Sequence, residues 1–214
     1  DEMKRVYLEN FNTVSNVIKY GAMNSEYGNS KILEKYQLKK DSFYLLIGRL
    51  VPDNNADVII KGFLKSYSNK KIVIVGDVPY RSSYSTILKK IKSDNIIFTG
   101  YLNKENELAD LYRNCFVYVH GHEFGGTNPT MINAIHFNCQ IMALSTIFNR
   151  EMLRNGEFGI FFNKEQKSIA DVFNQIESSK NMFKDSKFNR KKYIQKNYNW
   201  DLISNQYIDL FNKP

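Results

Sequence analysis

The fold is decided by the stretch CFVYVHGHEFGGTNPTMINA, residues 115–134. Its first six residues are apolar, β-branched or aromatic and end at a glycine, which predicts an interior strand of a parallel sheet. Gly125 and Gly126 then let the backbone turn and approach a ligand, while Asn128 can cap a helix whose first position suits Pro129. Free N–H groups at such a helix start favour a phosphate. The stretch therefore predicts a phosphate-binding loop, although the same residues also suit a strand-to-helix connection that binds nothing.

From residue 43 onward, short apolar runs alternate with amphipathic segments, which is the pattern of βαβ units on a parallel sheet. The expected strands are 43–47, 71–75, 95–98, 115–120, 140–144 and 159–162. The expected helices between them are 56–66, 84–92, 105–113, 129–137 and 148–153. We therefore predict an α/β fold with a Rossmann-like parallel sheet and helices on both faces.

Both ends of the chain depart from this alternation. Residues 1–29 are expected to be a linker or N-terminal arm, with 11–18 either a strand or an arriving linker, and 30–36 a helix. After residue 164 the pattern becomes helix upon helix, at 169–176, 183–198 and 201–211. We expect one Rossmann-like domain over 30–164, with C-terminal helices over 165–214 forming a tail that packs on the same domain.

Composition limits the kinds of partner. A formal charge of +8 on 214 residues favours anionic partners, such as a phosphorylated small molecule, an anionic membrane surface or nucleic acid. No recognition motif or basic stripe interleaved with aromatics emerges, so we expect no nucleic-acid partner. Cys115 and Cys139 lie in apolar surroundings without metal-ligand spacing, which predicts buried thiols, no metal site and a reducing compartment. No apolar run is long enough to span a membrane and the start lacks a signal-peptide profile, so we expect a cytoplasmic location, with peripheral contact at the inner face of the membrane.

Ligands of open parallel sheets bind beyond the carboxyl ends of the strands. Three loops are expected to converge there: 48–55, 76–79 and 125–128. Arg49 is the only fixed cation among them, and its guanidinium could hold a diphosphate through paired donors; the alternative is an ion pair at the sheet edge. The strand 71–75 is followed by GDVPY rather than G-x-G-x-x-G, which disfavours a dinucleotide-dependent dehydrogenase.

Six motifs occur along the chain: IGRLVPDNN at 47–55, KIVIVG at 71–76, IFTGYL at 97–102, HGHEFGGTNPTMINA at 120–134, NRE at 149–151 and YNWD at 198–201. With these residues, the chain resembles the C-terminal, donor-binding half of a family 4 glycosyltransferase of the GT-B fold. The resemblance covers most of residues 30–212. The GHExGGTNP block is similar to that of the bacterial rhamnosyltransferase branch.

Carried over residue by residue, the resemblance implies that Arg49 contacts the donor diphosphate. The lysine that many relatives place five residues later is Asn54 here. Tyr101 and Leu102 lie where relatives hold the nucleotide base through the backbone. The stretch 126–128, Gly126, Thr127 and Asn128, lies where relatives hold the phosphate and the sugar hydroxyls.

Many relatives also carry two glutamates eight residues apart. The first position is Gly125 here, as in the rhamnosyltransferase branch, and the second is Asn133. The usual glutamate accepts hydrogen bonds from the ribose, whereas Asn133 has one carbonyl acceptor and no charge. Glu123, His120 and His122 lie beside the loop, where they could orient the donor sugar or shuttle a proton. For His120, which ends a buried strand, the alternative is a structural role with a hydrogen bond to the backbone.

The resemblance implies retaining transfer of a hexose from a dTDP or UDP sugar, dTDP-rhamnose among them, in bacterial surface polysaccharide synthesis. It implies no cofactor and no metal, with Arg49 and Glu123 as the catalytic residues. The acceptor would bind a missing N-terminal domain, so this half alone is expected to be inactive. A noncatalytic module that binds a nucleotide sugar or a phosphoryl ligand is the alternative that Asn54 and Asn133 keep open.

Overall fold

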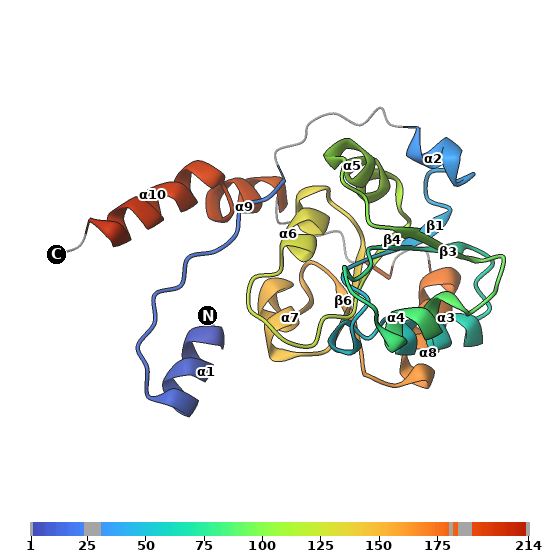
Figure 1. Cartoon of the computed structure of the whole chain (residues 1–214), viewed down its shortest axis with the longest axis horizontal. Helices are drawn as coiled ribbons and strands as arrows, with labels where there is room; N and C mark the ends of the chain where they lie inside the picture. The colour runs from blue at the N-terminus through green and yellow to red at the C-terminus, as the bar shows by residue number, and fades with distance from the viewer. Residues whose placement is uncertain (1, 24–30, 180–181, 184–189, 213–214) are drawn as a thin grey trace.

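The computed structural model describes residues 2–23, 31–179, 182–183 and 190–212 (Figure 1). Its centre is a six-stranded parallel sheet in the order β3-β2-β1-β4-β5-β6. The strands are β1 (Phe43–Ile47), β2 (Lys71–Val75), β3 (Ile96–Gly100), β4 (Val117–His120), β5 (Ile141–Leu144) and β6 (Ile160–Phe162). All six predicted strands are therefore confirmed, with boundary shifts of one or two residues in the last four.

Seven of the described helices lie where the sequence predicted helices. They are α3 (Ala56–Lys65), α4 (Ser83–Lys89), α5 (Glu105–Asn114), α6 (Pro129–His136), α7 (Ile147–Met152), α8 (Gln166–Ser178) and α10 (Trp200–Phe211). Short 3-10 turns at Pro52–Asn54 and Arg154–Gly156 lie in the loops after β1 and α7. Each of the seven overlaps its predicted range.

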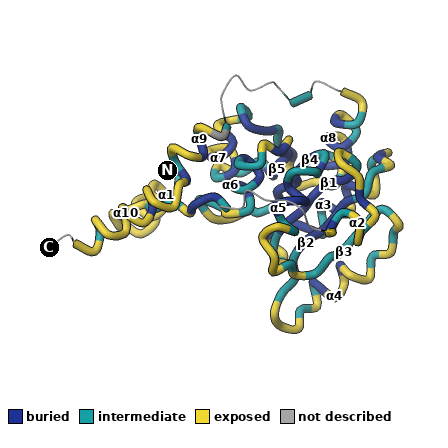
Figure 2. Tube along the Cα trace, turned by 90° about the horizontal axis from the view of Figure 1, so that it is seen from above, coloured by how far each residue is buried: buried dark blue, intermediate teal, exposed yellow. Residues whose placement is uncertain are grey.

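Alternate residues of the central strand β1 enter two separate cores. Phe43, Leu45 and Ile47 pack with α2 (Ile32–Lys35), α5, α6 and α9 (Arg190–Asn197). Tyr44 and Leu46 pack with α3, α4 and α8 on the opposite face. In Figure 2 the inner strands β1, β4 and β5 are buried, whereas β3 at the edge of the sheet is intermediate. The predicted α/β fold, a Rossmann-like sheet with helices on both faces, is confirmed.

One predicted helix begins later than expected, and the start of another lies outside the described residues. The helix expected over 183–198 begins at Arg190, and Phe183 is not helical, while 184–189 are outside the described residues. The helix expected over 30–36 is α2, and residue 30 is outside the described residues. The apolar residues at 183 and 194 belong to different cores, so they do not form one continuous face.

The start of the chain departs most from the prediction. Residues Glu2–Phe11 form α1, a helix that the sequence did not predict, and residues 12–23 contain no strand. Of the two alternatives for 11–18, the strand is therefore wrong, and residues 12–18 form a linker without regular secondary structure. Its backbone has no sheet edge to pair with, because the segment runs past α6 toward α9 instead (Figure 1). α1 itself lies against α7.

Both cysteines are buried and free, as predicted. Cys115 and Cys139 donate from their thiols to the Tyr112 carbonyl, at 3.3 and 3.2 Å. Among the described residues, no group of three or more His, Cys, Asp or Glu side chains could hold a metal ion. None of the helices in the described ranges has the length and apolar character to cross a membrane.

Candidate functional site

The strand order reverses between β1 and β4, and the crevice of such a sheet lies at this point. The loop after β1 starts with Gly48, and the loop after β4 contains His122. A Cβ on Gly48 would lie only 2.9 Å from His122 Cε1. Only glycine therefore lets the two loops approach this closely. A Cβ on Gly76 would lie 2.2 Å from the Gly48 carbonyl oxygen, so the predicted loop 76–79 also comes close to 48–55. The loop after β4 meets them at His122, ahead of the predicted stretch 125–128.

Hydrogen bonds join the same two loops. Asn55 donates from Nδ2 to the Gly121 carbonyl at 2.9 Å, and the backbone N–H of Glu123 donates to the Asp53 carbonyl at 3.0 Å. Asn54, which is buried, donates from Nδ2 to the Arg49 carbonyl at 2.8 Å. This bond fixes the turn that carries Arg49, so in this structure the Asn54 amide nitrogen shapes the loop.

Arg49 is exposed in the loop after β1. Within the described residues its guanidinium makes no ion pair, so the expected alternative role, an ion pair at the sheet edge, finds no partner there. Burial lowers the pKa of His122 to about 4, and the positive charge of Arg49 contributes in the same direction. The two residues are thus close enough to interact electrostatically, and His122 is neutral at neutral pH.

His120 and His122 are stacked, with ring centroids 4.5 Å apart and an interplanar angle of 13°. Burial, with a smaller effect from His122, lowers the pKa of His120 well below its ordinary value. Two buried ring nitrogens, His120 Nε2 and His122 Nδ1, have no hydrogen-bond partner in the described part of the chain. Each of the two histidines therefore has one ring nitrogen that makes no hydrogen bond to the described residues.

A chain of hydrogen bonds leads from His120 to the start of α6. The Tyr118 hydroxyl lies 3.1 Å from His120 Nδ1 and donates to Thr130 Oγ1 at 2.8 Å, and Thr130 Oγ1 donates to Asn128 Oδ1 at 2.8 Å. Since the Tyr118 proton is used toward Thr130, its oxygen accepts from His120, whose proton then sits on Nδ1. The chain leaves His120 Nε2 as a bare acceptor and ties β4 to the helix cap.

The loop 125–128 has the features of an anion cradle. Asn128 accepts from the backbone N–H of Thr130 at 3.0 Å and Pro129 takes the first position of α6, so both predicted roles are confirmed. Gly125 has a φ of +104°. Among the described residues, the backbone N–H groups of Gly125, Gly126 and Thr127 have no protein acceptor. These donors and the helix dipole together favour a phosphate.

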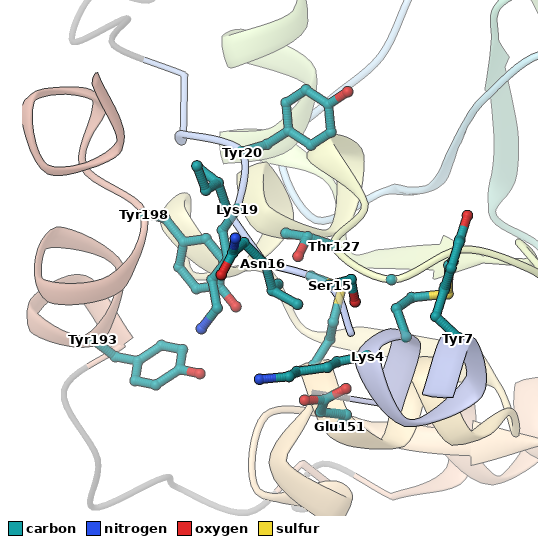
Figure 3. A pocket seen from close by; sticks show the side chains of 15 residues that line it. Lys4, Tyr7, Ser15, Asn16, Lys19, Tyr20, Thr127, Glu151, Tyr193 and Tyr198 are labelled. Atoms are coloured by element: carbon teal, nitrogen blue, oxygen red, sulfur yellow. The ribbon is translucent and has the colours of Figure 1, made fainter. Parts of the chain in front are cut away.

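α1 lies over this cradle. A Cβ on Gly126 would lie 2.7 Å from Met3 Cγ, so the backbone of the loop touches the N-terminal helix. A cavity of about 390 Å³ lies beside this contact and is lined by Gly126 and Thr127 together with residues of α1, the segment 15–20, α7 and the α9 region (Figure 3). This part of the cavity wall could not be predicted because α1 itself was not predicted.

Glu123, predicted to act in catalysis, is held in an ion pair. Lys164, in the loop after β6, lies 2.6 Å from Glu123 Oε2, and Asn55 Nδ2 lies 3.4 Å from the same oxygen. The hydrogen bond from Lys164 lowers the pKa of Glu123, outweighing a small opposing effect of burial. Glu123 is therefore a charged, weakly basic group. No sequence signal pointed to Lys164, because the pairing depends on where β6 lies.

The remaining predicted residues occupy the same edge of the sheet or its neighbourhood. Asn133 lies on α6, and its Oδ1 accepts the backbone N–H of Met23 at 2.8 Å. Tyr101 and Leu102 follow β3. Tyr101 is 75% exposed, and Leu102 packs partly against the core that contains Phe43, Leu45 and Ile47.

Asn149 is a site residue whose role the sequence did not show. It is buried, and its Nδ2 donates to the His122 carbonyl at 3.0 Å and to the Leu144 carbonyl at 2.9 Å. One side chain thus joins the loops after β4 and β5. The NRE motif marked this position, but only the fold shows that it supports His122.

The sequence matches the family described as "Glycosyl transferases group 1" over residues 29–200. The chain belongs to this family. The resemblance to a GT-B glycosyltransferase domain is thereby confirmed, while the finer assignments to family 4 and to its rhamnosyltransferase branch stay predictions.

Two curated relatives show how much of a family member the chain represents. It is 23% identical over 181 residues to the N-acetylgalactosamine-N,N'-diacetylbacillosaminyl-diphospho-undecaprenol 4-alpha-N-acetylgalactosaminyltransferase of Campylobacter jejuni, covering 84% of this chain and 47% of that protein. It is 22% identical over 187 residues to the alpha-monoglucosyldiacylglycerol synthase of Acholeplasma laidlawii, with the same coverage of 84% and 47%. The chain therefore spans about half the length of these relatives.

A similar solved structure is that of Anabaena HepE in complex with UDP and glucose. The TM-score is 0.73 at 14% identity, with 88% of this chain and 54% of that one covered. At this identity the similarity shows the fold alone.

Proposed function

We propose that this chain is the donor-binding part of an enzyme that transfers a hexose from a nucleoside diphosphate sugar. The observation that carries the proposal is the cradle at the start of α6. Three backbone N–H groups there, at Gly125, Gly126 and Thr127, lack protein acceptors within the described residues. They lie at the same carboxyl edge of the sheet as Arg49, whose guanidinium is exposed. Backbone donors, a helix dipole and one fixed cation suit a diphosphate.

Each residue has a role in this proposal. Arg49 and the cradle bind the diphosphate and stabilise the charge that develops as it leaves, which is the main electrostatic contribution to such a reaction. Transfer with retention at the sugar carbon, which the resemblance to family 4 implies, lets the departing diphosphate take the proton of the acceptor. Glu123, ion-paired and weakly basic, then serves to orient the sugar rather than to accept a proton. No metal is required in this scheme.

The relatives support a choice of nucleotide and sugar for the proposed donor. The HepE structure contains UDP and glucose, and the two curated relatives are named for transfer of N-acetylgalactosamine and for a glucosyl lipid. A UDP-hexose is therefore the first donor to test, with dTDP-rhamnose the donor favoured by the GHExGGTNP block. One relative is named for a diphospho-undecaprenol substrate, which supports the proposal that this protein acts at a membrane surface in polysaccharide synthesis.

The acceptor is proposed to bind a separate domain. The chain spans 47% of each curated relative, and apolar side chains on its two terminal helices are exposed. On α10, Tyr207, Ile208 and Phe211 are 45%, 54% and 79% exposed, whereas Ile203 is buried. Such a stripe suits packing against a further domain.

A noncatalytic nucleotide-sugar binder is the second candidate. Asn133, at the position where relatives bind ribose, already accepts from the Met23 backbone, and the Asn54 amide is engaged with the Arg49 carbonyl. Both observations favour reduced contact with the nucleotide. Glycosyl transfer by the whole protein, compared with binding alone, separates the two candidates.

Calorimetric titration with UDP, dTDP, UDP-glucose, UDP-N-acetylgalactosamine and dTDP-rhamnose tests the proposal. We expect micromolar to millimolar affinity, or about −4 to −8 kcal/mol. Arg49→Ala should weaken binding by about 1.5–3 kcal/mol if the guanidinium makes charge-assisted contacts with the diphosphate. Lys65→Ala, at the far end of α3, is the matched control and should bind as the wild type does. Equal affinity in the wild type and Arg49→Ala, or no nucleotide binding, would refute the proposed site.

A further inference from the structure

One end of the 390 Å³ cavity carries polar groups that the proposed diphosphate site does not use. The cavity has the size of a small-ligand site, and Gly126 and Thr127 of the cradle form part of its wall. The rest of the wall comes from α1, the segment 15–20, α7 and the region of α9. A ligand group in this cavity would therefore lie directly beside the phosphate-binding loop.

Five side chains point toward the same part of the cavity: Lys4, Lys19, Glu151, Tyr193 and Tyr198 (Figure 3). Lys19 Nζ lies 5.2 Å from the centre of the Tyr198 ring, and the rings of Tyr193 and Tyr198 are 5.9 Å apart. These contacts place residues from both ends of the chain in one cluster.

The cluster has more positive than negative charge. Lys4 and Lys19 bring two ammonium groups, whereas Glu151 brings one carboxylate, which also accepts the backbone N–H of Glu2 at 2.9 Å. Burial, followed by the neighbouring Tyr193, raises the pKa of Tyr198, so its phenol keeps its proton and can donate. The cluster therefore has one ammonium charge in excess of its carboxylate, and this charge can pair with a ligand.

We propose that this end of the cavity binds an anionic group, a carboxylate or a phosphate, on a sugar held beside the cradle. The inference rests on the proposed function only in that the cradle would position that sugar. Two sources supply the same chemistry: the transferred sugar could be a uronic acid, or the acceptor could carry a phosphate. In either case Lys4 and Lys19 select for charge, because a neutral hydroxymethyl group would leave their excess positive charge unpaired.

Paired titrations distinguish the two sources. In the first arm, UDP-glucuronate is compared with UDP-glucose, since the two differ only in a carboxylate against a hydroxymethyl group. In the second arm, glucose 6-phosphate is compared with glucose, with and without UDP. We expect the anionic member of at least one pair to bind about tenfold more tightly at low salt, with a smaller preference at higher ionic strength.

The variant Lys4→Met/Lys19→Met keeps the length of both side chains and should abolish the preference, while Lys65→Met should keep it. Circular dichroism melts confirm that both variants fold. No preference in either arm, or an undiminished preference in the folded double variant, overturns the inference. If UDP fails to bind while glucose 6-phosphate still binds more tightly than glucose, the proposed function fails and the anion site stands.

Discussion

The side-chain oxygen of Asn133, on α6, accepts a hydrogen bond from the backbone N–H of Met23 at 2.8 Å, across 110 positions of sequence. Two further bonds hold the same segment: the Ala22 N–H donates to the Tyr198 carbonyl at 2.8 Å, and Trp200 Nε1 donates to the Ala22 carbonyl at 2.9 Å. The N-terminal arm is therefore fastened to the C-terminal region beside the helix that carries the cradle. Asn133 therefore connects α6, the helix that begins at the cradle, to the N-terminal arm.

Replacing Asn133 by glutamate should give the residue both functions. One carboxylate oxygen can accept from Met23, which leaves the second oxygen to accept from a ribose hydroxyl. We expect UDP to bind about tenfold more tightly, the gain from one charge-assisted hydrogen bond of about 1.5 kcal/mol. Calorimetry with UDP measures the change.

Asn133→Gln is the matched control, because it has the length of glutamate without the charge. If Gln and Glu tighten UDP binding equally, side-chain length rather than the second acceptor is responsible. Equal or weaker binding in a folded Asn133→Glu variant would argue that the ribose position has been given over to holding the arm.

Gly21→Ala should loosen the arm. A Cβ at Gly21 would lie 2.4 Å from two ring carbons of Trp200, so the indole must move and its bond to the Ala22 carbonyl is lost. Overpacking of this kind costs about 1–3 kcal/mol. We expect faster hydrogen exchange at the Ala22 and Met23 amides, by roughly tenfold or more, with little change in β1.

A second substitution tests the cause of that change. In Gly21→Ala/Trp200→Phe, the smaller ring removes the clash, so exchange at Ala22 and Met23 should slow again compared with Gly21→Ala alone. Additive effects of the two substitutions would show that the indole contact does not hold the arm.

The sheet could be predicted because its strands carry an unambiguous signal. All five residues of β1 are buried, so the strand appears in the sequence as an uninterrupted apolar run. The start of α6 was equally clear, since Asn128 and Pro129 cap and begin a helix through local chemistry. α1 was not predicted although Met3, Tyr7 and Phe11 recur at helical spacing along it, because the helix is only ten residues long and none of its residues is buried.

The candidate site was predictable only where local sequence determines it. Arg49 and the 125–128 loop follow strands directly, so the fold alone brings them to one edge. Glu123 and Asn133 have partners that come from distant segments, Lys164 and Met23. Such pairings depend on tertiary packing, and a single sequence carries no pattern from which they could be inferred.

Tyr118→Phe should destabilise the protein by more than the usual loss of a hydroxyl group. The Tyr118 oxygen accepts from His120 in the buried interior, and its proton is donated to the half-buried Thr130. Phenylalanine leaves the His120 Nδ1–H unpaired and breaks the path to the α6 cap. We expect a loss of about 2–3 kcal/mol in the free energy of unfolding, measured by urea denaturation.

Tyr112→Phe provides the comparison. The Tyr112 ring is also buried, and its hydroxyl donates to the Thr130 carbonyl at 3.1 Å. That carbonyl belongs to α6 and can keep a helical partner, so we expect a loss of only about 1 kcal/mol. Equal losses in the two variants would contradict the idea that His120 depends on Tyr118.

Acidification should destabilise the fold between pH 7 and pH 5 through the stacked histidines. Burial lowers the pKa of His122 to about 4 and that of His120 well below its ordinary value, so both stay neutral in the folded state. Unfolded histidine takes up a proton near pH 6.5, so the unfolded chain binds more protons as the pH falls. Each neutral histidine then removes up to about 1.4 kcal/mol of stability per pH unit below 6.5, and contributes no pH dependence above it.

Urea denaturation at pH 7.5, 6.0 and 5.0 measures this slope, and His122→Gln should reduce it by the share of one histidine. Carboxylates with lowered pKa values, such as Glu123, stay ionised in both states over this range and add no slope there. His122→Gln also relieves the charge repulsion toward Arg49, which appears only once His122 is protonated, so its effect on stability at pH 7.5 should be small compared with its effect at pH 5. The same pH slope in the wild type and in His122→Gln would show that His122 is protonated equally in the folded and unfolded states.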